Sequence, residues 1–245
     1  MCRSAFRIVL GIGLSAWGAV STARASEPGL TARPAQGAVL PDAGRQVPEG
    51  LSASDWSGIR EAYEAGRHAA LAVDNGFQAR NPGQGWLTRF DGRGFLTTPD
   101  VGAWSWGLEL VSYGRGDTQR AVERARRADA RGGRVAYEWD DALTEWYVND
   151  PRGLEHGYTV HRRPQDVTGP VPQLRFTLAV RGDLRPRVSA EGRDVAFVSD
   201  SGAAVVNYSG LKVFDADGEE LPAWFAVESG ELSSFGNKQL GVGGQ

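Results

Sequence analysis

The strongest constraint on the fold of this chain is a repeated alternation of apolar and polar residues along short segments. Residues 174–181 read L-R-F-T-L-A-V-R, so that every second side chain is large and apolar. A period of two also runs through residues 104–110 and 134–139. Such alternation places one face of a strand in a core and the other in water, which is the pattern of antiparallel sheets.

Further segments with strand composition follow one another along most of the chain, separated by short turns rich in Gly, Asp and Pro. These segments are residues 86–91, 93–98, 143–149, 154–161, 184–189, 193–198, 203–208, 209–215 and 221–228. About ten to twelve short strands with almost no helix between them predict a mainly β fold, an antiparallel β-sandwich.

One short helix is expected before the strands. Ser52, followed three residues later by Asp55, has the form of a capping box, in which side chains bond to the unpaired amides of a helix start. Apolar residues then recur at helical spacing from Trp56 to about Leu71. We expect Trp56 and Tyr63 to pack onto the sheet that follows.

The first 25 residues have the three parts of a cleavable secretion signal. Arg3 and Arg7 form a cationic start, residues 8–20 an apolar run, and Ala23-Arg24-Ala25 an A-x-A cleavage site. The run has 13 residues and contains three glycines, whereas a membrane-spanning helix needs about 20 apolar residues. We therefore predict a protein secreted to the cell surface or medium by a Sec-type route, without a membrane span after cleavage.

Charge and cysteine content narrow the function classes. Removing residues 1–25 takes away three arginines and no acid, so the formal charge would fall from −3 to −6. An acidic chain has no electrostatic reason to bind nucleic acid, and the one dense basic stretch, 120–131, also holds acids and is expected to be a solvated insertion. The only cysteine is Cys2, so the mature chain can form no disulfide.

The two ends of the mature chain differ from its middle. Residues 26–50 hold four prolines and few large apolar residues, so they read as a flexible leader that cannot bury a core. The β-sandwich domain is expected over residues 51–230. Residues 231–245 show no strand period and are expected to be an irregular tail.

The densest group of reactive side chains lies between Trp139 and His161. A hydrolase would need two carboxylates across a cleft, and Asp140, Asp141 and Glu145 are candidates, as are Asp150 and Glu155. Their spacing singles out no pair. On a strand, Glu145 would share a face with Tyr147 and Asn149, and we assign that face to water.

His156 has the phase of an apolar face, with Leu154, Tyr158 and Val160. We expect a hydrogen-bonded core histidine, because neither His68 nor His161 lies at a spacing that builds a metal site with it. We predict neither a metal ion nor another cofactor. The acidic run 215–220 lacks the ligands of a calcium loop and reads as an Asp-Gly hairpin turn.

Tryptophan is abundant, with eight residues in the chain, one of which falls in the signal. Exposed tryptophans on a secreted β protein would favour stacking on sugars. Trp104, Trp106 and Trp139 have the phase of core residues, whereas Trp86 and Trp146 have an ambiguous phase. Trp86 and Trp146 are therefore the candidate sugar-binding residues, with Asp140, Asp141, Glu145 and His156 as further ligand-binding candidates.

Several longer runs resemble the amino-terminal module of large secreted bacterial FG-GAP repeat proteins, which carry an integrin-alpha-like β-propeller. The runs are W-S-G-I-R-E-A-Y-E-A-G-R-H from Trp56, N-P-G-Q-G-W from Asn81, F-D-G-R-G-F from Phe90, W-G-L-E-L from Trp106, E-W-Y-V-N-D-P-R-G-L-E-H-G-Y-T-V from Glu145, L-A-V-R-G-D-L-R-P from Leu178, G-R-D-V-A-F from Gly192 and Y-S-G-L-K-V-F-D-A-D-G from Tyr208.

The resemblance covers about residues 52–230 and implies a β-sandwich module that precedes calcium-binding repeats in adhesion-related proteins. It supplies no catalytic residues. The chain departs from the family after Glu231, where such proteins continue with another strand and the repeats, so the end reads as truncated or frameshifted. We expect a non-catalytic interaction module with surface or matrix proteins or glycans as partners. The alternatives are a carbohydrate-binding domain and a glycoside hydrolase or lyase fragment.

Overall fold

The computed structural model of the 245-residue chain describes residues 6–13, 47–115, 118–162, 173–228 and 239–244. The chain divides into two compact units, one formed by Met1–Ser15 with Glu64–Gln245 and the other by Ala16–Tyr63. The expected leader lies almost entirely outside the described residues. Within the described part, no helix is long and apolar enough to cross a membrane.

The expected helix is α1, Ala53–Arg67, and its start has the predicted cap. The Ser52 hydroxyl oxygen accepts a hydrogen bond from the Asp55 amide at 3.1 Å, and the same hydroxyl donates to the Asp55 carboxylate at 2.6 Å. No residue of α1 is buried and Tyr63 is 64% exposed; the expected packing of Trp56 and Tyr63 onto the sheet stays a prediction. Helical spacing alone does not say whether an apolar stripe meets a partner.

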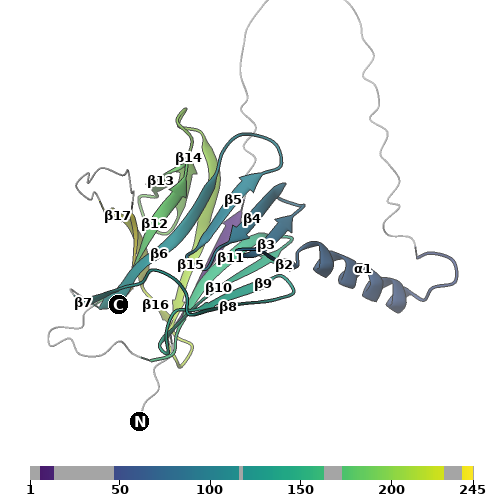
Figure 1. Cartoon of the computed structure of the whole chain (residues 1–245), viewed down its shortest axis with the longest axis horizontal. Helices are drawn as coiled ribbons and strands as arrows, with labels where there is room; N and C mark the ends of the chain where they lie inside the picture. The colour runs from purple at the N-terminus through teal and green to yellow at the C-terminus, as the bar shows by residue number, and fades with distance from the viewer. Residues whose placement is uncertain (1–5, 14–46, 116–117, 163–172, 229–238, 245) are drawn as a thin grey trace, which may run out of the picture. The chain divides into compact units, whose positions relative to one another are not determined.

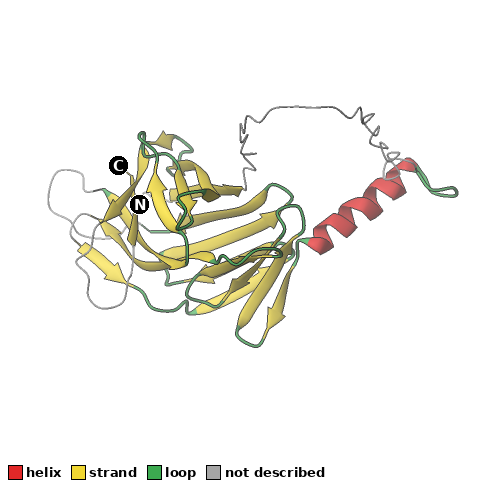
Figure 2. Ribbon diagram, turned by 90° about the horizontal axis from the view of Figure 1, so that it is seen from above, coloured by secondary structure: helices red, strands yellow, loops and turns green. Residues whose placement is uncertain are grey.

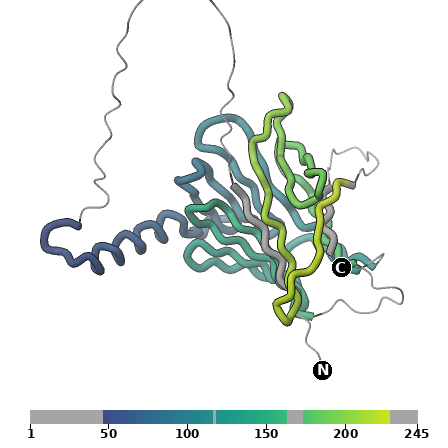
Figure 3. The backbone as a smooth tube through the Cα atoms, turned by 180° about the vertical axis from the view of Figure 1, so that it is seen from behind, coloured from purple at the N-terminus to yellow at the C-terminus, as the bar shows by residue number. Residues whose placement is uncertain are grey.

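Two antiparallel sheets of nine strands each make up nearly all of the rest (Figures 1 and 2). The first sheet has the order β13 (Arg185–Val188), β14 (Val195–Val198), β15 (Ala204–Phe214), β1 (Phe6–Gly13), β11 (Gly153–Val160), β10 (Leu143–Asp150), β9 (Arg134–Glu138) and β8 (Arg127–Arg131), with β16 (Glu220–Leu221) paired to β15. Figure 3 shows the teal and green segments β8 to β11 side by side from behind.

The strands of the second sheet are also paired antiparallel. Its order is β17 (Ala223–Glu228), β18 (Gln239–Gly244), β12 (Leu174–Gly182), β6 (Trp106–Arg115), β5 (Phe95–Pro99), β4 (Trp86–Phe90), β3 (Gly76–Asn81) and β2 (Ala70–Val73), with β7 (Thr118–Ala121) paired to β6. β12 and β6 share nine register pairs, with a register shift after Thr177.

An aromatic layer between the sheets forms the core. Phe176 of β12 stacks on Tyr158 of β11 with ring centroids 4.6 Å apart, and Trp106 of β6 lies 4.7 Å from Phe197 of β14. Trp106 is fully buried and Trp139 is nearly so, as their phase predicts. The predicted mainly β, antiparallel sandwich-like fold is confirmed, although the described strands outnumber the expected ten to twelve.

Three expectations about individual segments need correction. Residues 203–208 and 209–215 form the single long strand β15, because polar residues at its centre do not interrupt pairing. The basic stretch 120–131 is exposed as expected, but its ends belong to β7 and β8. The expected irregular tail contains β18, which pairs with both β12 and β17; residues 231–238 lie outside the described part.

The strand β1 comes from the apolar part of the predicted secretion signal. It pairs antiparallel with β11 from Phe6↔Val160 to Ile12↔Leu154 and with β15 from Arg7↔Phe214 to Gly13↔Asn207, and it appears in purple in Figure 1. A segment that the sequence predicts to be cleaved therefore occupies an interior position of the first sheet. Cleavage itself stays a prediction.

Close approach of β5 and β6 requires a glycine at position 107. A Cβ atom there would lie 1.9 Å from the Phe95 carbonyl oxygen. We predict that Gly107→Ala lowers the free energy of unfolding by about 2–3 kcal/mol, because the strands must separate. Urea unfolding of the full chain measures this effect.

The matched control is Gly66→Ala in α1, where a Cβ atom would have no neighbour within 4 Å. Alanine favours a helix over glycine by up to about 1 kcal/mol, so this variant should unfold at the wild-type urea concentration or slightly above it. Equal effects of the two substitutions would contradict the register of β5 and β6.

Candidate functional site

Two of the candidate site residues, Glu145 and His156, meet in the interior of the first sheet. Glu145 Oε1 lies 2.7 Å from His156 Nε2 and accepts a hydrogen bond from the Tyr158 hydroxyl at 2.8 Å. Glu145 Oε2 accepts from Trp139 Nε1 at 2.9 Å. Both Glu145 and His156 are at most 1% exposed. We call Glu145, His156, Tyr158, Trp139 and Tyr208 the Glu145 cluster.

His156 connects this carboxylate to the strand β15. Its Nδ1 lies 2.9 Å from the Tyr208 hydroxyl. An ionised carboxylate can only accept hydrogen bonds, so Nε2 is the donor to Glu145, and the direction of the bond between Nδ1 and Tyr208 depends on the tautomer of the ring. Tyr147 stacks on the imidazole at 4.7 Å and Phe95 of the second sheet meets it edge-on at 5.9 Å. The ring is therefore fixed on both faces.

The same burial changes the acidity of the surrounding phenols. Burial, together with the nearby Glu145 charge, raises the pKa of Tyr158 and of Tyr208 well above the usual range. Both phenols consequently keep their protons at physiological pH, and Tyr158 donates its proton to Glu145. The cluster is a closed set of matched donors and acceptors inside the core.

The prediction that Glu145 faces water is wrong, whereas the prediction of a buried, hydrogen-bonded His156 is confirmed. Glu145 pairs in register with Tyr158, and Tyr147 with His156, so the face of Glu145 is the core face. The alternation along β11 already indicates that Tyr158 lies on an apolar face. Assigning Glu145 to the same face also requires the pairing register between β10 and β11.

Asp140 and Asp141 are adjacent in sequence but differ in environment. The Asp140 carboxylate accepts from the Tyr113 hydroxyl at 2.5 Å and from the Ala142 and Leu143 amides, and it pairs with Arg120 at 2.8 Å. Its side chain is 5% exposed. That of Asp141 is 77% exposed and meets a single guanidinium nitrogen at 3.4 Å. Asp140 thus closes the turn between β9 and β10.

The pKa of Asp140 follows from these contacts. Burial alone raises it, but the bonds from Tyr113, from the Ala142 and Leu143 amides and from Arg120 together bring the pKa below its usual value. The carboxylate is therefore ionised and fully engaged at neutral pH.

Neither candidate sugar-binding tryptophan has an accessible ring. Trp86 and Trp146 are each 1% exposed. Trp146 Nε1 donates to the Thr159 hydroxyl at 3.2 Å, and the Arg134 guanidinium lies 4.9 Å from the ring centroid. Stacking on a sugar needs an open ring face, so these two side chains cannot provide a platform in this conformation.

A buried amide pair that sequence analysis did not identify joins the two sheets at one end. Asn81 of β3 donates through Nδ2 to Asn149 Oδ1 of β10 at 2.8 Å, and Asn149 Nδ2 donates to the carbonyls of His68 and Arg80. Both side chains are at most 3% exposed. Two asparagines separated by 68 residues carry no sequence signal of pairing.

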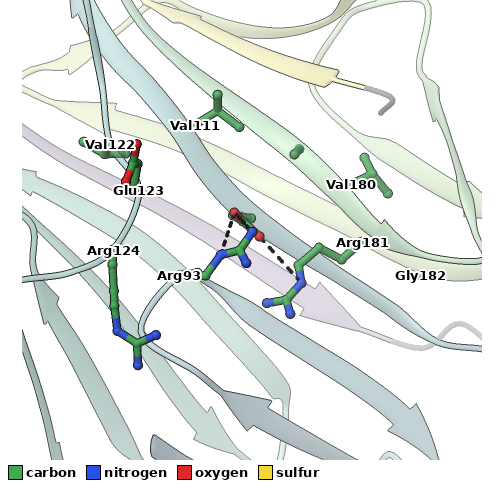
Figure 4. A pocket seen from close by; sticks show the side chains of 10 residues that line it. Arg93, Val111, Val122, Glu123, Arg124, Val180, Arg181 and Gly182 are labelled. Carbon is green, nitrogen blue, oxygen red and sulfur yellow. Dashed lines mark hydrogen bonds and ion pairs between the residues drawn. The ribbon is translucent and has the colours of Figure 1, made fainter. Parts of the chain in front are cut away.

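A polar surface cleft of about 800 Å³ is lined by residues of β6, β12 and the loops before β5 and β8 (Figure 4). Arg93 binds Glu109 through Nε and Nη2, at 3.0 and 2.5 Å, and Arg181 donates to Asp91 at 2.8 Å. Arg124 also lines the cleft. Because the arginines of the cleft lie among acidic side chains, the cleft does not carry an excess of positive charge.

Asp91, which bonds to Arg181 beside the cleft, has a lowered pKa. Burial raises the pKa of Asp91, but the hydrogen bonds from Arg181 and from the Arg93 and Gly94 amides lower it overall. Arg181 Nη1 is buried and has no hydrogen-bond partner among the described residues.

The described residues contain no group of three or more His, Cys, Asp and Glu side chains that could hold a metal ion. The run 215–220 forms a turn as predicted: Asp215 Oδ1 accepts from the Asp217 and Glu219 amides at 2.9 Å, and Gly218 has a φ of 89°. No protein-family model, curated protein or solved structure matches this chain. The FG-GAP resemblance therefore stays a prediction.

We predict that Glu145→Gln lowers the free energy of unfolding by about 2–4 kcal/mol, because an amide nitrogen cannot accept the bonds that the carboxylate accepts. Glu155→Gln on β11 is the matched control, because the Glu155 side chain is partly exposed and its carboxylate lies 3.7 Å from the Arg152 guanidinium, beyond hydrogen-bond distance. Chemical denaturation should show a change of about 0.5 kcal/mol or less for this control. A Glu145→Gln variant as stable as the wild type would contradict the structural role of Glu145.

Asp140 also predicts a pH dependence of stability. Its folded pKa lies below the unfolded value of about 3.9, so its contribution is present above that pH and is lost as pH falls through the folded pKa. Asp140→Asn should lower the melting temperature at pH 6, and the difference from wild type should shrink towards pH 3. Asp141→Asn should show little difference at either pH; a constant deficit for Asp140→Asn would argue against the depressed pKa.

Proposed function

We propose that this chain is a non-catalytic β-sandwich module, exported from the cell, that works by binding surface or matrix proteins or glycans. The observation that carries the proposal is the state of Glu145 and His156. These two side chains form the one candidate acid–histidine pair brought together by the fold, and they are buried and bonded only to one another and to core phenols and indole. Such a pair stabilises a core and has no contact with substrate.

The hydrolase alternative needs two carboxylates that share an accessible cleft. Glu145 is internal, and Asp140 has its oxygens occupied by Tyr113, Arg120 and two amides. Asp141 is well exposed, whereas Asp150 and Glu155 are partly exposed and both lie beside Arg152. An acid–base pair or an acid with a nucleophile needs two carboxylates across an accessible cleft, and neither pocket-lining set among the described residues contains any of these five side chains, which favours the binding module over the enzyme.

The carbohydrate-binding alternative rests on Trp86 and Trp146, whose rings are both internal. Among the described features, the cleft of Figure 4 is the better candidate for ligand contact, because it is open and lined by charged side chains. The resemblance to the leader module of FG-GAP repeat proteins agrees with an adhesion-related role. Both observations support a function at the surface of the module.

The proposal predicts an exported product without enzymatic activity. Expressed as the full chain in a bacterium with a Sec pathway, the protein should appear outside the cytoplasm with Ser26 as its amino terminus, because signal peptidase cuts after an A-x-A site. Edman sequencing measures this start. The product should leave a panel of glycosides, polysaccharides and uronate polymers unchanged.

Four variants separate binding from catalysis. Enzymatic turnover by the wild type that is lost in Asp140→Asn or Asp141→Asn would contradict the proposed non-catalytic function. The melting temperature of each variant is followed in parallel. Retention on insoluble polysaccharide that survives Arg181→Lys but is lost on Trp86→Phe would support the tryptophan-based alternative instead. A start at Met1 would contradict the export step alone.

A further inference from the structure

The position of β1 has a consequence for the exported protein. β1 is antiparallel to both β11 and β15, so these two strands run parallel to one another with β1 between them. We propose that signal cleavage empties this position and that an extended strand of another protein chain fills it, paired antiparallel with β11 and β15. The inference rests on the proposed export, since it requires a cut after Ala25.

The empty position would be a slot lined by core residues. On β11, Leu154, His156, Tyr158 and Val160 are each at most 1% exposed. On β15, Val206, Tyr208, Leu211 and Val213 are buried as well. Removing β1 leaves the backbone N–H and C=O groups along one side of each strand without partners and opens the core between them. Both costs favour a replacement strand.

The walls of the slot are held in place without β1. The His156 imidazole on β11 reaches the Tyr208 hydroxyl on β15 at 2.9 Å, which is a side-chain bond between two strands that β1 separates. Glu145 fixes the other ring nitrogen of His156 from β10. This brace keeps β11 and β15 at the separation that admits a strand. The slot is therefore preorganised for strand addition.

The present occupant defines the chemistry of the donor. β1 reads F-R-I-V-L-G-I-G, with an apolar residue at positions 6, 8, 10 and 12. Those four positions are in register with Val160, Tyr158, His156 and Leu154. A donor strand should accordingly have about eight residues, apolar residues at every second position and no proline, since its N–H groups must bond on both sides.

Residues 26–245 contain no further segment of this kind. The described strands of this range already occupy positions in the two sheets. Residues 26–46 hold prolines at positions 28, 34 and 41, and residues 163–172 hold three more, so neither has eight consecutive residues without proline. Residues 229–238 contain two large apolar residues, Leu232 and Phe235, three positions apart. We therefore assign the donor to another protein.

Peptide binding to the exported protein tests the slot. The probe is a fluorescent peptide of residues 5–14 with two added lysines for solubility, and the control is the same peptide with Val9→Pro, which removes a central N–H. The probe should bind saturably, raise the melting temperature by several degrees and slow hydrogen exchange of the β11 and β15 amides. The control should bind at least tenfold more weakly.

The natural donor is tested by a photo-crosslinking amino acid at Glu155, which lies on β11 opposite Gly11 of β1. In the producing organism, the crosslink should map to an alternating apolar segment of a different protein. A crosslink to the same sequence in a second copy, or a dimer that excludes the probe, would overturn the assignment to another protein.

The export step and the slot fail separately. An exported protein that still begins at Met1 contradicts the proposed export and, with it, the vacancy. A protein that begins at Ser26, binds no probe and already protects the β11 and β15 amides keeps the proposed function and overturns the slot.

Discussion

The described fold depends on the satisfaction of one buried carboxylate. Glu145 accepts bonds from His156, Tyr158 and Trp139, which lie on β11 and just after β9. A carboxylate in an apolar interior without these donors would cost several kcal/mol. Because the donors come from neighbouring strands, the requirement fixes the register of β9, β10 and β11 as well as their pairing. His156 extends the constraint to Tyr208 on β15.

The aromatic layer around this cluster joins the two sheets. Phe176 stacks on Tyr158, and Phe95 meets both His156 and Tyr147 edge-on. Each of these contacts pairs a ring of the second sheet with a member or neighbour of the Glu145 cluster. Hydrophobic burial and hydrogen bonding therefore act at the same place. The combination explains how a chain without disulfides after its predicted signal can hold two large sheets together.

Local pattern was sufficient for the fold class and for much of the strand set. Period two found β6, β9 and β12, and strand composition between turns found β4, β5, β10, β11, β13 and β14. It missed β2 and β3, where Gly76 and half-buried residues weaken the alternation. It placed Glu145 in water for a different reason: which face of β10 is internal depends on pairing with β11, and pairing is a long-range property. The Asn81–Asn149 bond was out of reach for the same reason.

The central claim is that the Glu145 cluster is one cooperative structural network from β10 to β15. A double-mutant cycle of Glu145→Gln and Tyr208→Phe, measured by urea unfolding, tests it directly. The residues are joined through His156, so we expect a coupling free energy of about 1 kcal/mol. The reference cycle pairs Glu145→Gln with Tyr113→Phe, whose hydroxyl bonds to Asp140, and should be additive. Additivity in both cycles would contradict the network.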